Sequence, residues 1–209
     1  MNELIQKSMR QVLDLAASAA PAPGGGSVSA LTACLGLSMT IMVGNLTLGK
    51  KNYQTVQGEV TELISAAKGL SNELEILAQD DMDVFTRFMT AMGLPKTTTE
   101  EQAIRKDAME EALLFATETP LETARVCLKG LEFTSRMAVI GNKSAVSDVG
   151  VAALLLKAAL IGALLNVEAN IAMSKDQVHV QRVKVECKSL IARATAMEED
   201  TLITVRGKI

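Results

Sequence analysis

The feature that most constrains the fold is a long segment without charge, because residues 28–48 contain no acidic or basic side chain. A helix that lacks a charged face is either buried on most sides or placed in a membrane. Directly before this segment stands the sequence Pro-Ala-Pro-Gly-Gly-Gly-Ser, residues 21–27. Glycines let backbone N–H groups approach a ligand closely, and Ser27 can cap the helix that follows. The positive end of that helix predicts a binding place for an anion or a flat polar ring.

A second apolar segment, residues 149–167, is interrupted only by Lys157, so a membrane protein is one alternative. Both segments approach the roughly 20 residues that a membrane span needs. However, Ser, Thr, Gly and Asn residues dilute the first segment, and it lacks the aromatic residues that anchor a span at a membrane interface. We therefore predict that both segments are central helices of a soluble bundle, with no membrane partner.

Helical periodicity accounts for almost the whole chain, and no segment has a convincing strand period. Gly93 and Pro95 end one long amphipathic segment, and Thr98 with Glu101 forms a capping box that starts the next helix. Pro120 suits the first turn of a further helix, and Ser147 or Asp148 can cap another. The expected helices are approximately residues 3–18, 28–46, 54–92, 98–119, 120–137, 147–174 and a last one from 176.

These patterns predict a single all-α domain over residues 1–209, a bundle of six to eight helices around two long, nearly uncharged central ones. Small residues at Ala30, Ala33 and Gly36 on one central helix, and at Ala159 and Gly162 on the other, allow close backbone packing. The remaining amphipathic helices cannot easily cover all of this apolar surface. We therefore expect a homo-oligomer, most simply a two-fold dimer.

Composition excludes several classes of function. A net charge of -3 and the near absence of aromatic residues argue against nucleic-acid binding. The three cysteines, Cys34, Cys127 and Cys187, are widely spaced and odd in number, so we interpret them as buried hydrophobes in a reducing compartment, with no metal site. The N-terminal pattern is amphipathic and contains Glu3 and Asp14, unlike a secretory signal. The expected location is the cytoplasm.

The glycine segment also lacks the marks of a nucleotide site. No Gly-Lys-Ser/Thr sequence follows it, and no strand–helix–strand unit surrounds it. The only histidine, His179, has polar neighbours on its helix that are typical of a solvated face. A serine or cysteine nucleophile would need a histidine partner, so that chemistry is disfavoured.

The strongest catalytic candidates are two carboxylates. Asp81 falls on an otherwise apolar helical stripe with Leu77 and Phe85, where a lone carboxylate is costly to bury. It is therefore either functional or paired with a neighbouring helix. Asp148 precedes an almost purely apolar helix, where an ordinary helix-cap role is equally suitable. Asp148 lies roughly 27 Å from Asn166 along the same helix, so one small site in one subunit cannot use both.

Other polar residues are candidates for binding. Asn166 and Asn170 lie four residues apart and share a helix face. Lys50 and Lys51 close the uncharged helix, where they can meet a carboxylate ligand or the last helix carbonyls. Lys96 and Lys143 lie in expected loops, where ligand contacts concentrate.

Several segments, in order along nearly the whole chain, together resemble the cyclodeaminase/cyclohydrolase family of folate enzymes. The family includes the C-terminal half of formiminotransferase-cyclodeaminase and its stand-alone bacterial relatives. Ser144 departs from the pattern, which has asparagine there. The segments that carry the resemblance are residues 23–27, 46–53, 94–96, 141–142, 147–153, 166–167 and 170.

The resemblance implies an all-α homodimer that binds a tetrahydrofolate derivative, with or without a polyglutamate tail, in a cleft near the subunit interface. It implies closure of 5-formimino-tetrahydrofolate to the 5,10-methenyl form with loss of ammonia, or alternatively hydrolysis of the methenyl form to 10-formyl-tetrahydrofolate. Asp81 and Asp148 are the expected catalytic acids, and no cofactor beyond the tetrahydrofolate carrier is expected. A non-catalytic bundle that binds a small anion remains a further alternative. The expected substrate-binding residues are Gly24, Gly25, Gly26, Ser27, Lys50, Lys51, Tyr53, Pro95, Lys96, Asn142, Lys143, Asn166 and Asn170.

Overall fold

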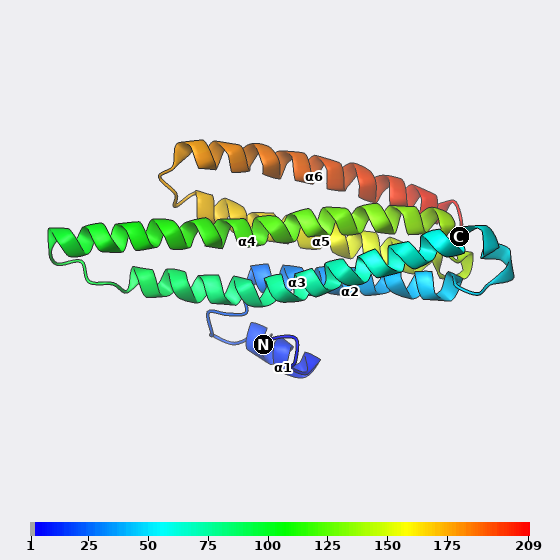
Figure 1. The fold of residues 1–209 in the computed structure, drawn as a ribbon, viewed down its shortest axis with the longest axis horizontal. Coiled ribbons are helices and arrows are strands. Elements are labelled where there is room, and N and C mark those ends of the chain that lie inside the picture. The colour runs from blue at the N-terminus through cyan, green and yellow to red at the C-terminus, as the bar shows by residue number, and fades with distance from the viewer. Residues whose placement is uncertain (1–2) are drawn as a thin grey trace.

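The computed structural model describes residues 3–209, which form an elongated bundle of α-helices without a strand in this range (Figure 1). This confirms the all-α prediction. Its α-helices are α1 (Met9–Ala16), α2 (Gly25–Thr47), α3 (Gln57–Met92), α4 (Thr99–Ile140), α5 (Val146–Ile171) and α6 (Gln177–Arg206). Two short 3-10 helices, η1 (Lys51–Val56) and η2 (Lys143–Ala145), precede α3 and α5.

The two apolar helices α2 and α5 pack directly against each other because small residues bring their backbones together. A Cβ atom at Gly36 would lie 3.2 Å from the carbonyl oxygen of Ala152, and one at Gly162 would lie 2.5 Å from Ser29 Oγ. Helices α3 and α4 complete a four-helix core, since α3 contacts α2 and α4 contacts α5. The sequence-based prediction of a closely packed central pair is therefore correct.

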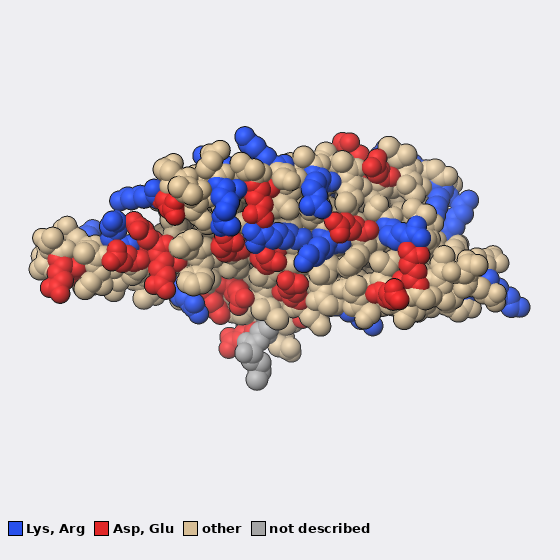
Figure 2. Space-filling view, turned by 45° about the horizontal axis from the view of Figure 1, so that its top comes forward, with Lys and Arg blue, Asp and Glu red and all other residues tan. Residues whose placement is uncertain are grey.

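Helix α6 covers the remaining side of α4 and α5, and charged side chains join it to α4. Arg125 binds Glu186 at 2.7 Å, and Arg193 binds Glu132 at 3.2 Å. The half-buried Lys157 binds the buried Glu198 at 2.7 Å and so links α5 to α6. Figure 2 shows basic and acidic groups interspersed over one face, rather than gathered into a patch of one sign.

The outer faces of α2 and α5 remain uncovered in the monomer. By length and composition alone, the spans Gly25–Thr47 and Lys143–Ile171 are apolar enough to cross a membrane, and 56% and 50% of their most apolar windows are buried inside the bundle. The buried halves form the core, as expected. The exposed halves carry large apolar side chains, Val28, Leu35, Leu46, Val151, Leu154, Ile161 and Leu165, which we call the α2/α5 face.

The expected break at Pro120 is wrong, because α4 runs through Pro120 as one helix of 42 residues. Proline has no N–H, so the carbonyl of Ala116 loses its usual partner within the helix. The amide of Asn170, on α5, donates to that carbonyl instead. Tertiary packing and this replacement bond thus preserve the helix, and Pro120 itself is buried.

Helix starts were predicted with mixed success. Thr98 with Glu101 and Asp176 cap α4 and α6, as expected. Helix α1 is shorter than residues 3–18 and begins after a capping box at Ser8. Ser147 and Asp148 lie inside the first turn of α5, whose N-cap residue is Ala145. Likewise, the N-cap residue of α2 is Gly24 rather than Ser27.

Candidate functional site

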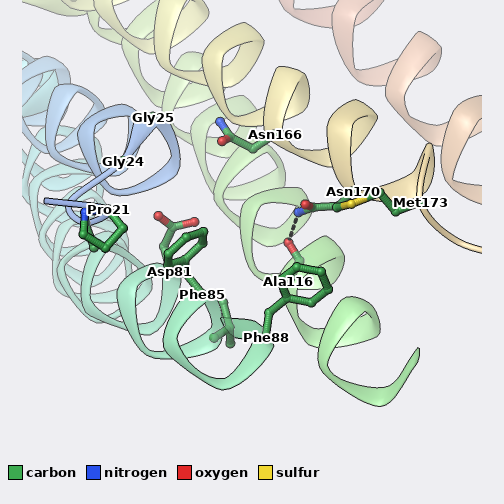
Figure 3. A pocket seen from close by; sticks show the side chains of 12 residues that line it. Pro21, Gly24, Gly25, Asp81, Phe85, Phe88, Ala116, Asn166, Asn170 and Met173 are labelled. Atoms are coloured by element: carbon green, nitrogen blue, oxygen red, sulfur yellow. Dashed lines mark hydrogen bonds between the residues drawn. The ribbon is translucent and has the colours of Figure 1, made fainter. Parts of the chain in front are cut away.

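A cavity of about 210 Å³ lies at the N-terminal end of α2, where α3, α4 and the end of α5 meet. Figure 3 shows Asp81 pointing from α3 toward the glycine turn, with Asn166 and Asn170 approaching from α5. Three candidate segments far apart in the sequence thus meet in one place. The lining residues are Pro21, Ala22, Gly24, Gly25, Asp81, Val84, Phe85, Phe88, Ala116, Asn166, Asn170 and Met173.

Asp81 is held by the N-terminal turn of α2. Its Oδ2 atom accepts two hydrogen bonds of 2.8 Å from Ser27, one from the backbone N–H and one from Oγ. A Cβ atom at Gly26 would lie only 2.1 Å from Asp81 Oδ1, so only glycine permits this approach. The positive helix end that was expected to bind an anionic ligand therefore already binds a carboxylate of the protein.

The environment of Asp81 alters its acidity. Burial raises the pKa of this carboxyl group above the ordinary aspartate value, and the two hydrogen bonds from Ser27 oppose that effect. Because burial is the larger cause, the carboxylate is a stronger base than an exposed aspartate. A raised pKa beside a cavity is typical of a general acid or base.

Among the described residues, Asn166 and Asn170 each have an unpaired amide oxygen at the cavity, whereas each Nδ2 uses one of its two N–H groups within the bundle. The Asn166 Nδ2 donates to the carbonyl of Gly162 at 2.9 Å, and the Asn170 Nδ2 donates to that of Ala116. Within residues 3–209, neither Oδ1 atom accepts a hydrogen bond, and neither does Asp81 Oδ1. No Lys or Arg lines the cavity. This arrangement suits a ligand that is cationic or rich in N–H donors.

A second group of candidate residues lies at the other end of α2, a helix of 23 residues, or about 33 Å away. Here Asn142 stabilises a turn, because its Nδ2 donates to the carbonyl of Leu46 at 2.8 Å and its Oδ1 accepts from the N–H of Ser144 at 3.0 Å. The hydroxyl of Tyr53 accepts from the N–H of Lys143 at 2.9 Å. Both side chains thus have structural contacts in the monomer.

Lys50, Lys51 and Asp148 lie at that same distant end, beside η1 and η2. Pro95 and Lys96 lie in the α3–α4 loop and do not line the cavity. Within one chain, the structure therefore brings together the glycine turn, Asp81 and the two asparagines, and leaves the other candidate residues outside the cavity. His179 lines a different cavity, with Glu110 and Lys175.

Sequence reasoning missed the aromatic and aliphatic walls of the site. Phe85 and Phe88 line the cavity from α3, although the apolar stripe on that helix gave no reason to separate them from the core, and Met173 lines it from the turn after α5. The sequence also did not predict that the backbone carbonyl of Ala116 accepts a hydrogen bond from Asn170, because every residue has such a carbonyl. Pro120, four residues later, was the available signal.

The structure is thus an all-α bundle with a half-buried carboxylate in a cavity at the N-terminal end of α2. Residues 8–189 match the model of the formiminotransferase-cyclodeaminase family. The chain belongs to this family, which confirms the resemblance.

Named relatives extend the match over the whole chain. The chain is 37% identical over 203 residues to a methenyltetrahydrofolate cyclohydrolase of Methylorubrum extorquens, covering 97% of this chain and 98% of the relative. It is 32% identical over 191 residues to the formimidoyltransferase-cyclodeaminase of Rattus norvegicus. That match covers 91% of this chain but only 35% of the rat protein, so this chain spans about a third of that relative.

The fold also has a close counterpart among solved structures. The crystal structure of a formiminotetrahydrofolate cyclodeaminase from Thermotoga maritima superimposes with a TM-score of 0.89 at 26% identity. The superposition covers 98% of each chain.

Proposed function

We propose that this protein is a methenyltetrahydrofolate cyclohydrolase, which hydrolyses 5,10-methenyl-tetrahydrofolate to 10-formyl-tetrahydrofolate. The full-length similarity to the Methylorubrum cyclohydrolase carries the choice of reaction. It reverses the order expected from the sequence, where ring closure with loss of ammonia came first. The cavity around Asp81 is the proposed site.

The chemistry of the cavity supports a cationic substrate. The methenyl carbon lies between two nitrogens that share a positive charge, and the carboxylate of Asp81 would stabilise that charge. The oxygens of Asn166 and Asn170 would accept hydrogen bonds from the N–H groups of the pterin ring. The apolar ring of Phe85 or Phe88 would cover a face of the substrate. No cofactor other than the tetrahydrofolate carrier is required.

Asp81 would act first as a general base and then as a general acid. It accepts a proton from a water molecule as the water oxygen bonds to the methenyl carbon, which gives a neutral tetrahedral intermediate. The bond from this carbon to N5 then breaks, Asp81 returns the proton to N5, and the hydroxyl group loses its proton as the formyl group forms on N10. The balance is one water consumed and one proton released.

The second candidate is the cyclodeaminase reaction, which the Thermotoga structure and the rat relative favour by name. In that reaction, N10 attacks the formimino carbon and ammonia leaves after protonation. The same carboxyl group would deliver the proton. The two reactions share a tetrahedral carbon bonded to N5 and N10, so the cavity suits both.

We also propose a two-fold dimer formed through the α2/α5 face. Asp148 is half-buried and lies three residues before the exposed Val151, on the same side of α5. A two-fold axis perpendicular to α2 would bring the Asp148 end of one protomer toward the Asp81 cavity of its partner. This arrangement would reconcile the two groups of candidate residues, which lie far apart within one protomer.

Absorbance of the methenyl group tests the reaction. Purified protein is incubated separately with 5,10-methenyl-tetrahydrofolate and with 5-formimino-tetrahydrofolate, and an enzyme-free sample corrects for spontaneous hydrolysis. Loss of absorbance from the first substrate supports the cyclohydrolase. Growth of absorbance from the second, without catalysed loss from the first, would establish the cyclodeaminase instead. No change with either would favour a non-catalytic binding protein.

A further inference from the structure

A second cavity, of about 300 Å³, adjoins the Asp81 cavity. The two cavities share Phe88 and Met173 as walls, so they lie next to each other, and we call the pair the groove. The Asp81 cavity alone is smaller than the roughly 300–1,000 Å³ usual for ligands of this size. A substrate as long as tetrahydrofolate therefore needs the second cavity as well.

The second cavity is rich in cations, whereas the first has none. Arg105, Lys106 and Lys175 line it, with Glu110 as the one acidic residue. Lys106 is only loosely paired with Glu110, at 3.9 Å between two exposed side chains. Lys175 forms no ion pair or hydrogen bond through its side chain with residues 3–209. The cavity thus retains unused positive charge.

Local structure orients these cations. Arg105 donates from Nε and Nη2 to the carbonyl of Met92, at 3.1 and 3.0 Å, which fixes its guanidinium group and leaves Nη1 available. Lys175 lies in the turn after α5, where the N–H of Met173 donates to the carbonyl of Asn170 at 3.0 Å. The cationic cavity is therefore lined by the turn that directly follows Asn170 and that contributes Met173 to both cavities.

The order of chemical groups along the groove matches one class of ligand. Acceptors at Asp81, Asn166 and Asn170 come first, apolar surfaces at Phe88 and Met173 come next, and cations come last. A ligand that fits has a cationic or donor-rich head, an aromatic middle and an anionic tail. Met109 and Leu113 extend the apolar surface into the second cavity.

We propose that the cavity of Arg105, Lys106 and Lys175 binds the aminobenzoyl-glutamate tail of the substrate, including additional γ-linked glutamates. This inference rests on the proposed function for the identity of the head group. Lys50, Lys51 and Lys96, which the sequence predicted as substrate-binding residues, line neither cavity.

The direct test uses a probe without a pterin ring, p-aminobenzoyl-triglutamate, measured by calorimetry on the full-length protein. Wild type should bind it, and the variants Lys175→Gln and Arg105→Gln should each bind about three- to tenfold more weakly, because one charged contact is lost. Lys129→Gln is the matched control, since Lys129 is an exposed residue of α4 outside both cavities. Circular dichroism verifies that each variant is folded.

Kinetics separate this inference from the proposed function. With methenyl-tetrahydrofolate carrying one or three glutamates, the two variants should raise KM, more for the triglutamate, and leave kcat nearly unchanged. Equal probe binding by wild type, Lys175→Gln and Arg105→Gln would overturn the tail site, even if the wild type is an active cyclohydrolase. If the wild type turns over neither folate but binds the probe through these cations, the tail site stands and the proposed function fails.

Discussion

At the scale of single residues, the proposed site depends on the hydrogen bonds that hold the carboxylate of Asp81 within the apolar stripe of α3. Asp81 is neither paired with a basic residue nor freely solvated, because the N-terminal turn of α2 supplies both of its hydrogen bonds. Such a carboxylate remains available to react, since no salt bridge neutralises it. We therefore propose that Ser27 positions Asp81, in addition to the substrate contact predicted from the sequence.

The bond from Ser27 gives a pH-dependent prediction. In the proposed mechanism Asp81 acts as a base in its ionised form, so kcat/KM should fall as pH drops through its pKa. Ser27→Ala removes one of the hydrogen bonds that lower this pKa. The acid limb of the pH profile should therefore move to higher pH. Thr61→Ala is the control, because it removes an exposed hydroxyl on α3 and should leave the acid limb of the pH profile unchanged. An unchanged acid limb in Ser27→Ala would contradict the effect of Ser27 on the pKa of Asp81.

Gly26 permits the contact between α2 and Asp81. In Gly26→Ala, the new methyl group would displace the carboxylate, so we expect a fall of about 100-fold in kcat/KM. Gly69→Ala in α3 is the control, because no atom lies within 4 Å of its new methyl group. That control should be fully active and more stable to urea by about 0.5–1 kcal/mol. Normal activity of Gly26→Ala would show that the carboxylate position is unimportant.

At the scale of helices, α5 donates a hydrogen bond to α4 at the point where a proline removes a backbone N–H from α4. Pro120 leaves the carbonyl of Ala116 without its helical partner, and Asn170 takes that place. The bond fixes the amide so that its oxygen is free for a ligand. Pro120 therefore affects both the backbone hydrogen bonding of α4 and the orientation of Asn170 in the Asp81 cavity.

Pro120→Ala tests this link. The restored N–H of residue 120 would compete with Asn170 for the Ala116 carbonyl, so kcat/KM should fall about three- to tenfold while the helical circular dichroism is retained. Asn170→Leu should lose at least as much. The double variant should show little further loss, because both changes act on one interaction. Fully additive losses would mean that Pro120 acts elsewhere.

Most helices, and the caps at Thr98 and Asp176, were predictable from periodicity and local signals, because those depend on neighbouring residues. Asp81 was recognisable because it interrupts an apolar stripe. The bond from α2 to Asp81 and the continuity of α4 depend on residues far apart in the chain, so no local pattern contained them. The tail cavity was missed for the same reason, since Arg105 and Lys175 meet only after α4 and α5 pack.

At the scale of the whole molecule, the α2/α5 face is an apolar surface without a partner in the monomer. Leu154 and Leu165 are 50% and 61% exposed, and they lie in the same stripe of α5. Contiguous apolar surface of this kind usually marks an interface. A two-fold dimer would bury both copies of this face.

A charge placed in the α2/α5 face should separate the subunits. Leu154→Glu would place two carboxylates in an apolar interface, so sedimentation velocity should show a dimer for the wild type and a monomer for the variant. Ile203→Glu is the control, because Ile203 is 67% exposed on α6, outside this face. Identical sedimentation of wild type and Leu154→Glu would exclude this interface.

The most direct measurement of the central claim is the rate at which Asp81→Asn consumes methenyl absorbance from 5,10-methenyl-tetrahydrofolate. Asparagine keeps the size of the side chain but cannot accept the proton, so kcat should fall at least about 100-fold relative to wild type. The variant should remain folded by circular dichroism. A folded Asp81→Asn with wild-type kcat would contradict the assignment of Asp81 as the catalytic base.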